Sequence, residues 1–177
     1  MKLKFLNLHL QNSWVQSKNL IEILVITISK PLLIGVYKDK QLLRQIEQNG
    51  LTSDELPILF KDLLEEFDVK TIIYVNTPGS FMSIKIAYIF LKTITMIKGI
   101  EFLAANGFLF NQNSPIKALG KKYFINENEE IKVDFLPNMC KISDFELPKS
   151  LENIDFSKDT LPIYNLPAVW RLHFEAL

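Results

Sequence analysis

A short turn comes nearest to a reactive or ligand-binding site in this sequence. Pro78, Gly79 and Ser80 follow an apolar run and precede a long apolar segment. Free backbone N–H groups at a helix start can bind phosphate, and a serine hydroxyl can act as a nucleophile. The turn lacks the glycines and the lysine of a P-loop. Serine is also a common N-cap residue, whose hydroxyl accepts from a free N–H, and we expect that role for Ser80.

Other reactive groups are sparse. Cys140 is the single cysteine, and His9 and His173, the only histidines, lie near opposite ends of the chain. An intramolecular disulfide is excluded, a histidine pair at metal-binding spacing is absent, and a serine or cysteine nucleophile would lack a positioned base. We therefore expect no metal site and no hydrolase chemistry. Cys140 is interpreted as an inert, partly buried thiol in a protein of the reducing cytosol.

The composition is that of a folded domain. Apolar residues make up 48% and charged residues 23% of the 177 residues, and 20 basic residues balance 20 acidic ones. Such a balance gives no reason to expect broad nucleic-acid binding. No run reaches the roughly 18 apolar residues of a membrane span. One segment has interleaved basic and aromatic residues, which we interpret as a solvated strand face rather than a tRNA site: Lys117, Lys121, Lys122, Tyr123, Phe124 and Lys132.

Hydrophobic periodicity predicts three strands and then alternating helices and strands. The strands are expected at 20–29, 31–39, 40–49, 69–76 and 100–104, and the helices at 53–67 and 81–98. Thr52 and Glu55 fit a capping box at the first helix, and Gly99 fits a stop for the second. This order predicts an α/β fold, with the mixed sheet of ribonuclease-H-like, actin-like (ASKHA) proteins.

The chain divides into three parts by composition. Residues 1–19 are interpreted as a leader outside the core, and residues 20–104 as the ribonuclease-H-like lobe. Residues 105–177 are expected to form a reduced second lobe, with short strands, loops and an extended tail.

The predicted helix at 81–98 is apolar on nearly every side, although a helix lying on a sheet needs only one apolar stripe. We therefore expect that a second surface packs on the side of this helix that faces away from the sheet. That surface is either another subunit or another part of the same chain. The candidate anchors of a partner interface are Leu56, Leu59, Phe60, Leu63, Phe81, Ile84, Tyr88 and Leu91. Some of these must face the chain's own sheet, and the sequence does not separate the two groups.

The turn and its surroundings resemble one family. The segment "TPGSFMSIKIA" is similar to the "GPGSFTGLRIG" signature of the TsaB (YeaZ) family, "ILVITIS" to its "ILAIDTS", "LTSDELPILFKDLL" to its "HSERLLPLIDELL", and "LPIYNLPAVW" to its "EPVYLRNNVAW". The matches run in the same order from Leu20 to Trp170. They are poorest between Asn111 and Asp159.

The resemblance implies a cytoplasmic, actin-like protein without chemistry of its own. TsaB is the dimerisation subunit of the complex that makes N6-threonylcarbamoyladenosine in tRNA. It would present its two N-lobe helices to the catalytic subunit TsaD, with the ATPase TsaE joining them, and would meet tRNA only through the complex. A homodimer through the same helices is a further implication. This chain alone is expected to bind no cofactor, and whether ATP or ADP and Mg lie at the joint with the partner stays open.

The departures from the family pattern point away from catalysis. The family aspartate of "AIDTS" is Thr27, and a threonine cannot supply the negative charge that organises metal and phosphate in ATP-using members of this fold. The first glycine of the turn is Thr77, the arginine is Lys85, and the histidine before the first helix is Leu51. We interpret the chain as a reduced, non-catalytic member. The alternative is an ATP-binding hydrolase or kinase that uses the turn at Pro78, Gly79 and Ser80.

Overall fold

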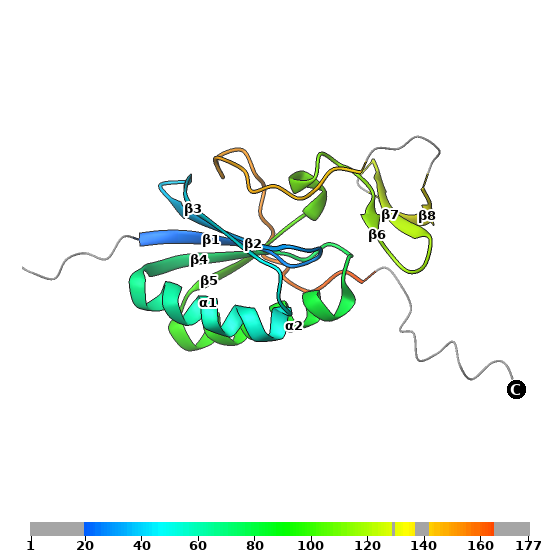
Figure 1. Ribbon diagram of the computed structural model, residues 1–177. Helices are drawn as coiled ribbons and strands as arrows, with labels where there is room; N and C mark the ends of the chain where they lie inside the picture. Colours follow the sequence, from blue (N-terminus) through cyan, green and yellow to red (C-terminus); the bar gives the residue numbers. More distant parts are fainter. Residues whose placement is uncertain (1–19, 129, 137–141, 165–177) are drawn as a thin grey trace, which may run out of the picture.

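The computed structural model describes residues 20–128, 130–136 and 142–164. Its main layer is a five-stranded sheet in the order β3-β2-β1-β4-β5, with both long helices on one face (Figure 1). The elements are β1 (Leu20–Ile26), β2 (Leu32–Lys38), β3 (Gln41–Gln48), α1 (Thr52–Glu66), β4 (Asp68–Val75), α2 (Phe81–Lys98) and β5 (Glu101–Ala105). β1, β4 and β5 are parallel, whereas β2 and β3 are antiparallel to their neighbours. The predicted fold class is confirmed.

A smaller antiparallel sheet follows. It consists of β6 (Ile116–Lys117), β7 (Lys122–Glu127) and β8 (Glu130–Phe135), and a 3-10 helix, η1 (Gly107–Phe110), connects it to β5. The short strands predicted in this region are therefore present. The division of the chain into two lobes stays a prediction.

Two positions show how the backbone turns between elements, and the second of them, Gly99, was predicted. Asp39 and Lys40 form the turn between β2 and β3, and both have positive φ angles, of 51° and 66°. Two such residues suit the right-handed twist of a hairpin. Gly99 ends α2 in the left-handed conformation at φ 67°, where a side chain would be strained.

The predicted helix starts need correction. The N-cap of α1 is Leu51 and has no side-chain cap bond, so the capping box of Thr52 and Glu55 is wrong. The carbonyl of Leu51 instead accepts from the N–H groups of Asp54 and Glu55, both at 3.0 Å. Ser80 does hold the N-cap position of α2, but its hydroxyl hydrogen-bonds with the Ser83 hydroxyl at 2.9 Å and caps no backbone group.

Residues 142–164 form an extended strap over the sheet face opposite the helices (Figure 1). The N–H of Leu151 donates to the carbonyl of Lys40 at 2.8 Å, beside the edge strand β3. At the other edge, Ala104 of β5 and Ser157 exchange two backbone hydrogen bonds, of 2.8 and 2.9 Å. The strap thus satisfies backbone groups at both edges of the sheet, which would otherwise be open to pairing with another chain.

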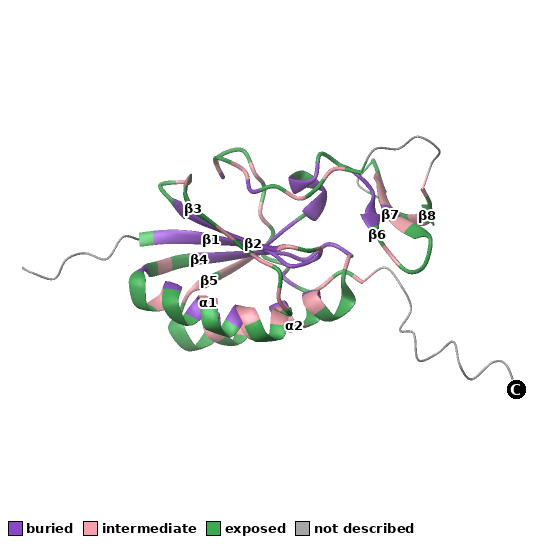
Figure 2. Cartoon of the chain, in the orientation of Figure 1, coloured by how far each residue is buried: buried purple, intermediate pink, exposed green. Residues whose placement is uncertain are grey.

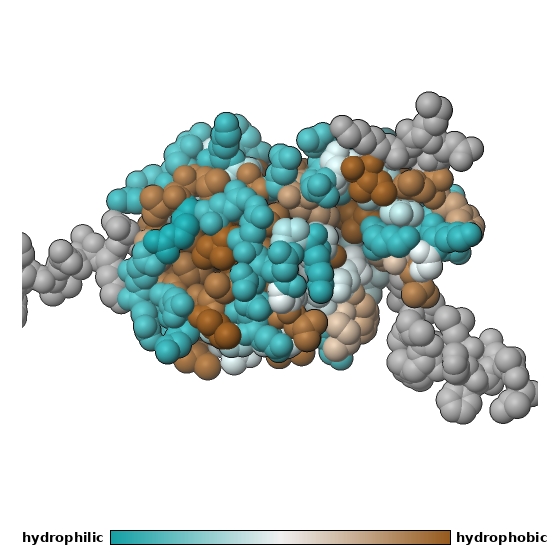
Figure 3. Space-filling model, viewed as in Figure 1, coloured by the Kyte–Doolittle hydropathy of each residue, from teal (hydrophilic) through white to brown (hydrophobic). Residues whose placement is uncertain are grey.

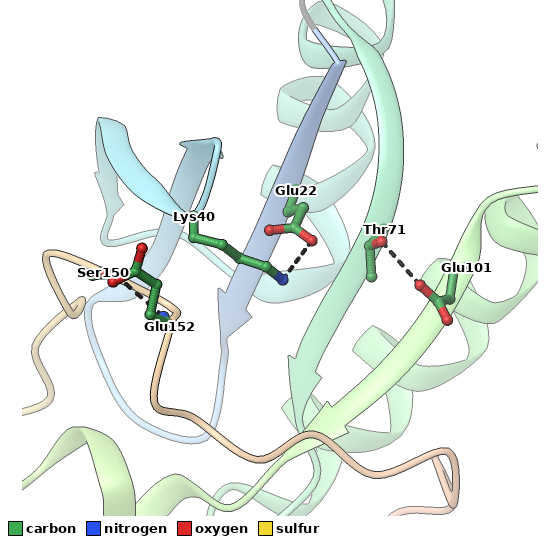
Figure 4. A network of polar contacts seen from close by, with 6 residues as sticks. All are labelled: Glu22, Lys40, Thr71, Glu101, Ser150 and Glu152. Atoms are coloured by element: carbon green, nitrogen blue, oxygen red, sulfur yellow. Dashed lines mark hydrogen bonds and ion pairs between the residues drawn. The ribbon is translucent and has the colours of Figure 1, made fainter.

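Polar side chains also form contacts that involve three strands of the sheet (Figure 4). Lys40 pairs with Glu22 of β1 at 2.8 Å, and the Thr71 hydroxyl of β4 donates to the Glu101 carboxylate of β5 at 3.1 Å. The Lys40 ammonium also lies 5.9 Å from the ring centroid of Phe156 in the strap. Glu22 is only 9% exposed, so its charge depends on this lysine for compensation.

Buried residues are concentrated between the helices and the strap (Figure 2). β1 and β2 are buried at almost every position, as the continuous apolar runs predict for strands covered on both faces. Among the described residues, no helix combines the length and the apolar content that crossing a membrane requires.

Candidate interaction surface

The inner faces of α1 and α2 belong to the core of the protein. Phe60 of α1 meets Phe90 of α2 edge to face, with ring centroids 5.8 Å apart, and Tyr88 lies 6.1 Å from Tyr74 of β4. Five of the eight candidate anchors are at most 2% exposed: Leu56, Phe60, Leu63, Ile84 and Leu91. They pack against the chain's own sheet, so they are not available to a partner.

The other three candidates lie at the margins of the helical layer. Leu59 and Tyr88 are half-buried. Phe81 is 46% exposed, and its ring packs on Tyr164 of the strap with centroids 4.6 Å apart. These three can contribute to an interface, but only at its edges.

The outer face of α2 carries an apolar stripe that the candidate set did not contain. Met82, Ile89 and Met96 are seven residues apart and are 59%, 55% and 74% exposed. Positions seven apart lie almost on one line along a helix, and Ile89 is turned by about 140° from the buried Ile84. We define the α2 stripe as Met82, Ile86, Ile89, Met96 and Ile97. Figures 2 and 3 show exposed residues, many of them apolar, over the helical layer.

The two helices differ in charge. α2 carries three lysines and no acidic residue, whereas α1 carries five carboxylates and one lysine. One of these carboxylates, Glu66, is tied to Arg44 of β3 by hydrogen bonds of 2.5 and 2.8 Å. The Arg44 guanidinium lowers the pKa of the Glu66 carboxyl by this hydrogen bond. An apolar stripe on a basic helix beside an acidic helix is suited to a protein partner with a matching arrangement.

The turn at Pro78, Gly79 and Ser80 is closed by Ile28. The N–H of Ser80 donates to the carbonyl of Ile28 at 3.0 Å. A methyl group on Gly79 would lie 2.7 Å from the Ile28 side chain, and one on Gly107 would lie 2.7 Å from the end of the same side chain. Ile28 therefore fills the space beside the turn, where a phosphate would need room and free N–H groups.

The neighbouring polar residues have structural roles. Thr77, at the position of a family glycine, accepts from the N–H of Gly107 and donates to Asn106 at 3.4 Å. Thr27 is 2% exposed, and its hydroxyl has no hydrogen-bond partner in the described part of the chain. The described residues include no group of three or more His, Cys, Asp or Glu that could hold a metal. Cys140, His9 and His173 lie outside the described residues.

Two shallow cavities of about 280 Å³ each lie near the carboxyl ends of the strands. One is lined by apolar residues and by polar residues that include Asn76, Asp155 and Asp159. The lining of the other includes Lys30 and Asn111. Among the described residues that line them there is no cysteine and no histidine. The basic and aromatic segment at 117–132 does not form a stacking surface with both its aromatics, because Phe124 is 1% exposed.

The fold is similar to that of YeaZ from Pseudomonas aeruginosa, with a TM-score of 0.52 and 15% identity over 64% of this chain and 63% of that chain. It is also similar to an uncharacterized protein with similarity to peptidase YeaZ from Pseudomonas aeruginosa, with a TM-score of 0.51 and the same identity and coverage. The chain spans less than two thirds of the length of these structures. No family model and no curated protein matches it. The resemblance to the TsaB (YeaZ) family is thus matched by the fold.

Proposed function

We propose that this chain is a divergent TsaB-like protein that acts as a non-catalytic dimerisation subunit. It docks on a TsaD-like catalytic subunit of a cytoplasmic complex that makes N6-threonylcarbamoyladenosine in tRNA, with a TsaE-like ATPase as the third member. The observation that carries the proposal is the exposed α2 stripe on a fold similar to that of YeaZ. Contact with tRNA occurs only through the complex.

Burial of the stripe is the physical reason for docking. Large apolar side chains gain free energy when a partner removes them from water, and Met96 and Ile97 are both about three-quarters exposed. Helix packing of ridges into grooves would place the stripe against a helical surface of the partner. The lysines of α2 and the carboxylates of α1 would then fix the orientation, since a reversed partner would bring like charges together.

The same surface can accept a second copy of this chain. A two-fold axis would place the stripe against itself and the α2 lysines near the α1 carboxylates of the other copy. Homodimer and heterodimer therefore compete for one face. Where the complex uses a nucleotide with Mg, we place that nucleotide at the interface between this chain and the partner.

The test is co-purification with the cognate TsaD-like protein, followed by a measurement of complex mass and of modified adenosine in tRNA. Ile89→Asp buries a charge at the centre of the proposed interface and should abolish the complex and the modification. Leu109→Asp is the matched control, since Leu109 is 57% exposed on η1, outside the helical layer. The proposal is wrong if Ile89→Asp and the wild-type protein bind the partner equally well.

An ATP-binding enzyme that uses the turn is the less well supported alternative. It conflicts with the closure of the turn by Ile28 and with the absence of a carboxylate at Thr27. A magnesium-dependent ATPase activity of the isolated chain that disappears in Ser80→Ala would reverse this ranking.

A further inference from the structure

The described part of the chain ends beside the start of α2. The strap pairs with Asn76 just before the turn, where the N–H of Ile163 donates to the Asn76 carbonyl at 2.9 Å and the Asn76 amide donates to the Leu161 carbonyl at 3.1 Å. Tyr164, the last described residue, packs its ring on Phe81, the first residue of α2. Residues 165–177 therefore leave from the end of the helix at which the α2 stripe begins.

These residues have the composition and the length to cover the stripe. The sequence after Tyr164 is "NLPAVWRLHFEAL", which places four large apolar side chains in its last eight residues: Trp170, Leu172, Phe174 and Leu177. Thirteen extended residues span up to about 43 Å, whereas the 18 residues of α2 span about 27 Å. The tail also carries Arg171 and Glu175, which are opposite in sign to the carboxylates of α1 and the lysines of α2.

We propose that residues 165–177 of the same chain bind the α2 stripe when no partner is present. A segment tethered at one end of an apolar surface reaches it at an effective concentration in the millimolar range. Tail and partner would then compete for one surface, so a partner must displace the tail in order to bind. The competition depends on the function proposed above, but the docking of the tail does not.

Tryptophan fluorescence tests the docking in the full chain. The sequence has two tryptophans, so Trp14→Phe leaves Trp170 as the single reporter. We expect a blue-shifted emission and weak quenching by acrylamide, both independent of protein concentration because the contact is intramolecular. Adding Ile89→Asp should raise the quenching constant roughly twofold or more, as the indole returns to water. Adding Leu109→Asp should leave it unchanged.

Three results would overturn the proposal. In the first, acrylamide quenches Trp170 as strongly as a free indole. In the second, the protection of Trp170 survives Ile89→Asp. In the third, the protection appears only as protein concentration rises, which would place the tail on a second copy. The first result includes the case in which residues 1–19 or another molecule occupy the stripe in place of the tail. Met96→Asp, at a position 74% exposed, serves as a second variant, and far-UV circular dichroism checks that both variants are folded.

A binding measurement separates the two proposals. If both hold, Trp170→Ala should raise the affinity for the TsaD-like protein, because the competing tail is weakened. If no TsaD-like protein binds while Trp170 is protected as described, the tail proposal stands and the proposed function fails.

Discussion

Two positions in α2, two residues apart, should respond in opposite ways to the same substitution. Leu91 is fully buried against the sheet, whereas Ile89 is 55% exposed on the outer face. Leu91→Ala removes buried methyl groups and leaves a cavity, which costs about 2–5 kcal/mol of unfolding free energy. For a chain of this size, that loss lowers Tm by about 4–20 °C.

Ile89→Ala should leave the stability of the isolated chain nearly unchanged. The lost side chain is half solvated, and alanine has a better helix propensity than isoleucine by roughly 0.4 kcal/mol. For binding to the partner, Ile89→Ala should be the more harmful of the two substitutions, since truncation of a central apolar anchor costs about 1–2 kcal/mol of binding free energy. Leu91→Ala, measured well below its Tm, should bind the partner as the wild-type protein does.

Urea unfolding, monitored by circular dichroism, compares the stabilities of the two variants. Titration calorimetry with the partner compares their binding free energies. The reasoning is refuted if both variants destabilise the isolated chain equally, because the outer face of α2 would then be part of the core. It is also refuted if Leu91→Ala is neutral, since α2 would then present a different side to the sheet.

Three further substitutions test contacts elsewhere. Gly79→Ala should destabilise by about 1–3 kcal/mol in urea unfolding, because the added methyl would lie 2.7 Å from Ile28. Burial raises the pKa of Tyr37 above the ordinary value, so stability should be complete below about pH 10 and fall above it, where the unfolded phenol ionises first. Burial also raises the pKa of Tyr74, so Tyr37→Phe should reduce the alkaline slope, and adding Tyr74→Phe should reduce it further, in urea midpoints measured between about pH 8 and pH 11. Lys40→Met should cost about 1–2 kcal/mol by leaving the Glu22 carboxylate unpaired, and adding Glu22→Gln should restore part of it.

The order of elements was predictable because each element carries a local signal. Most of β1 and the second half of β4 are apolar runs, as strands buried on both faces require. α2 is bounded by Ser80 and Gly99, and Gly99 holds the left-handed conformation that glycine allows most readily. Thr52 and Glu55 have the residue types and the spacing of a capping box. The prediction failed because the helix begins at Thr52 itself, one residue earlier than an N-cap at Thr52 requires.

The choice between core and surface on α2 was not predictable, for a physical reason. An amphipathic helix identifies its inner face by contrast with polar residues, but α2 offers Ile84 and Leu91 on one side and Met82 and Ile89 on the other. Both sets have helical spacing. Only the position of the sheet decides that the first set is buried, and that position depends on contacts far apart in the sequence.

The strap could not be predicted from its residues either. It is held partly by backbone hydrogen bonds such as that between Leu151 and Lys40, and a backbone bond leaves no mark on residue type. The Tyr37 and Tyr74 hydroxyls also donate to strap carbonyls, but these tyrosines lie far from the strap in the sequence. The contact of Ile28 with Gly79 and Gly107 is a similar case, because it joins three loops that only the fold brings together. The sequence does indicate, at Thr27, that a carboxylate is missing. The filling of the adjacent space by Ile28 is an independent obstacle to a phosphate, so restoring the charge with Thr27→Asp should not by itself create nucleotide binding.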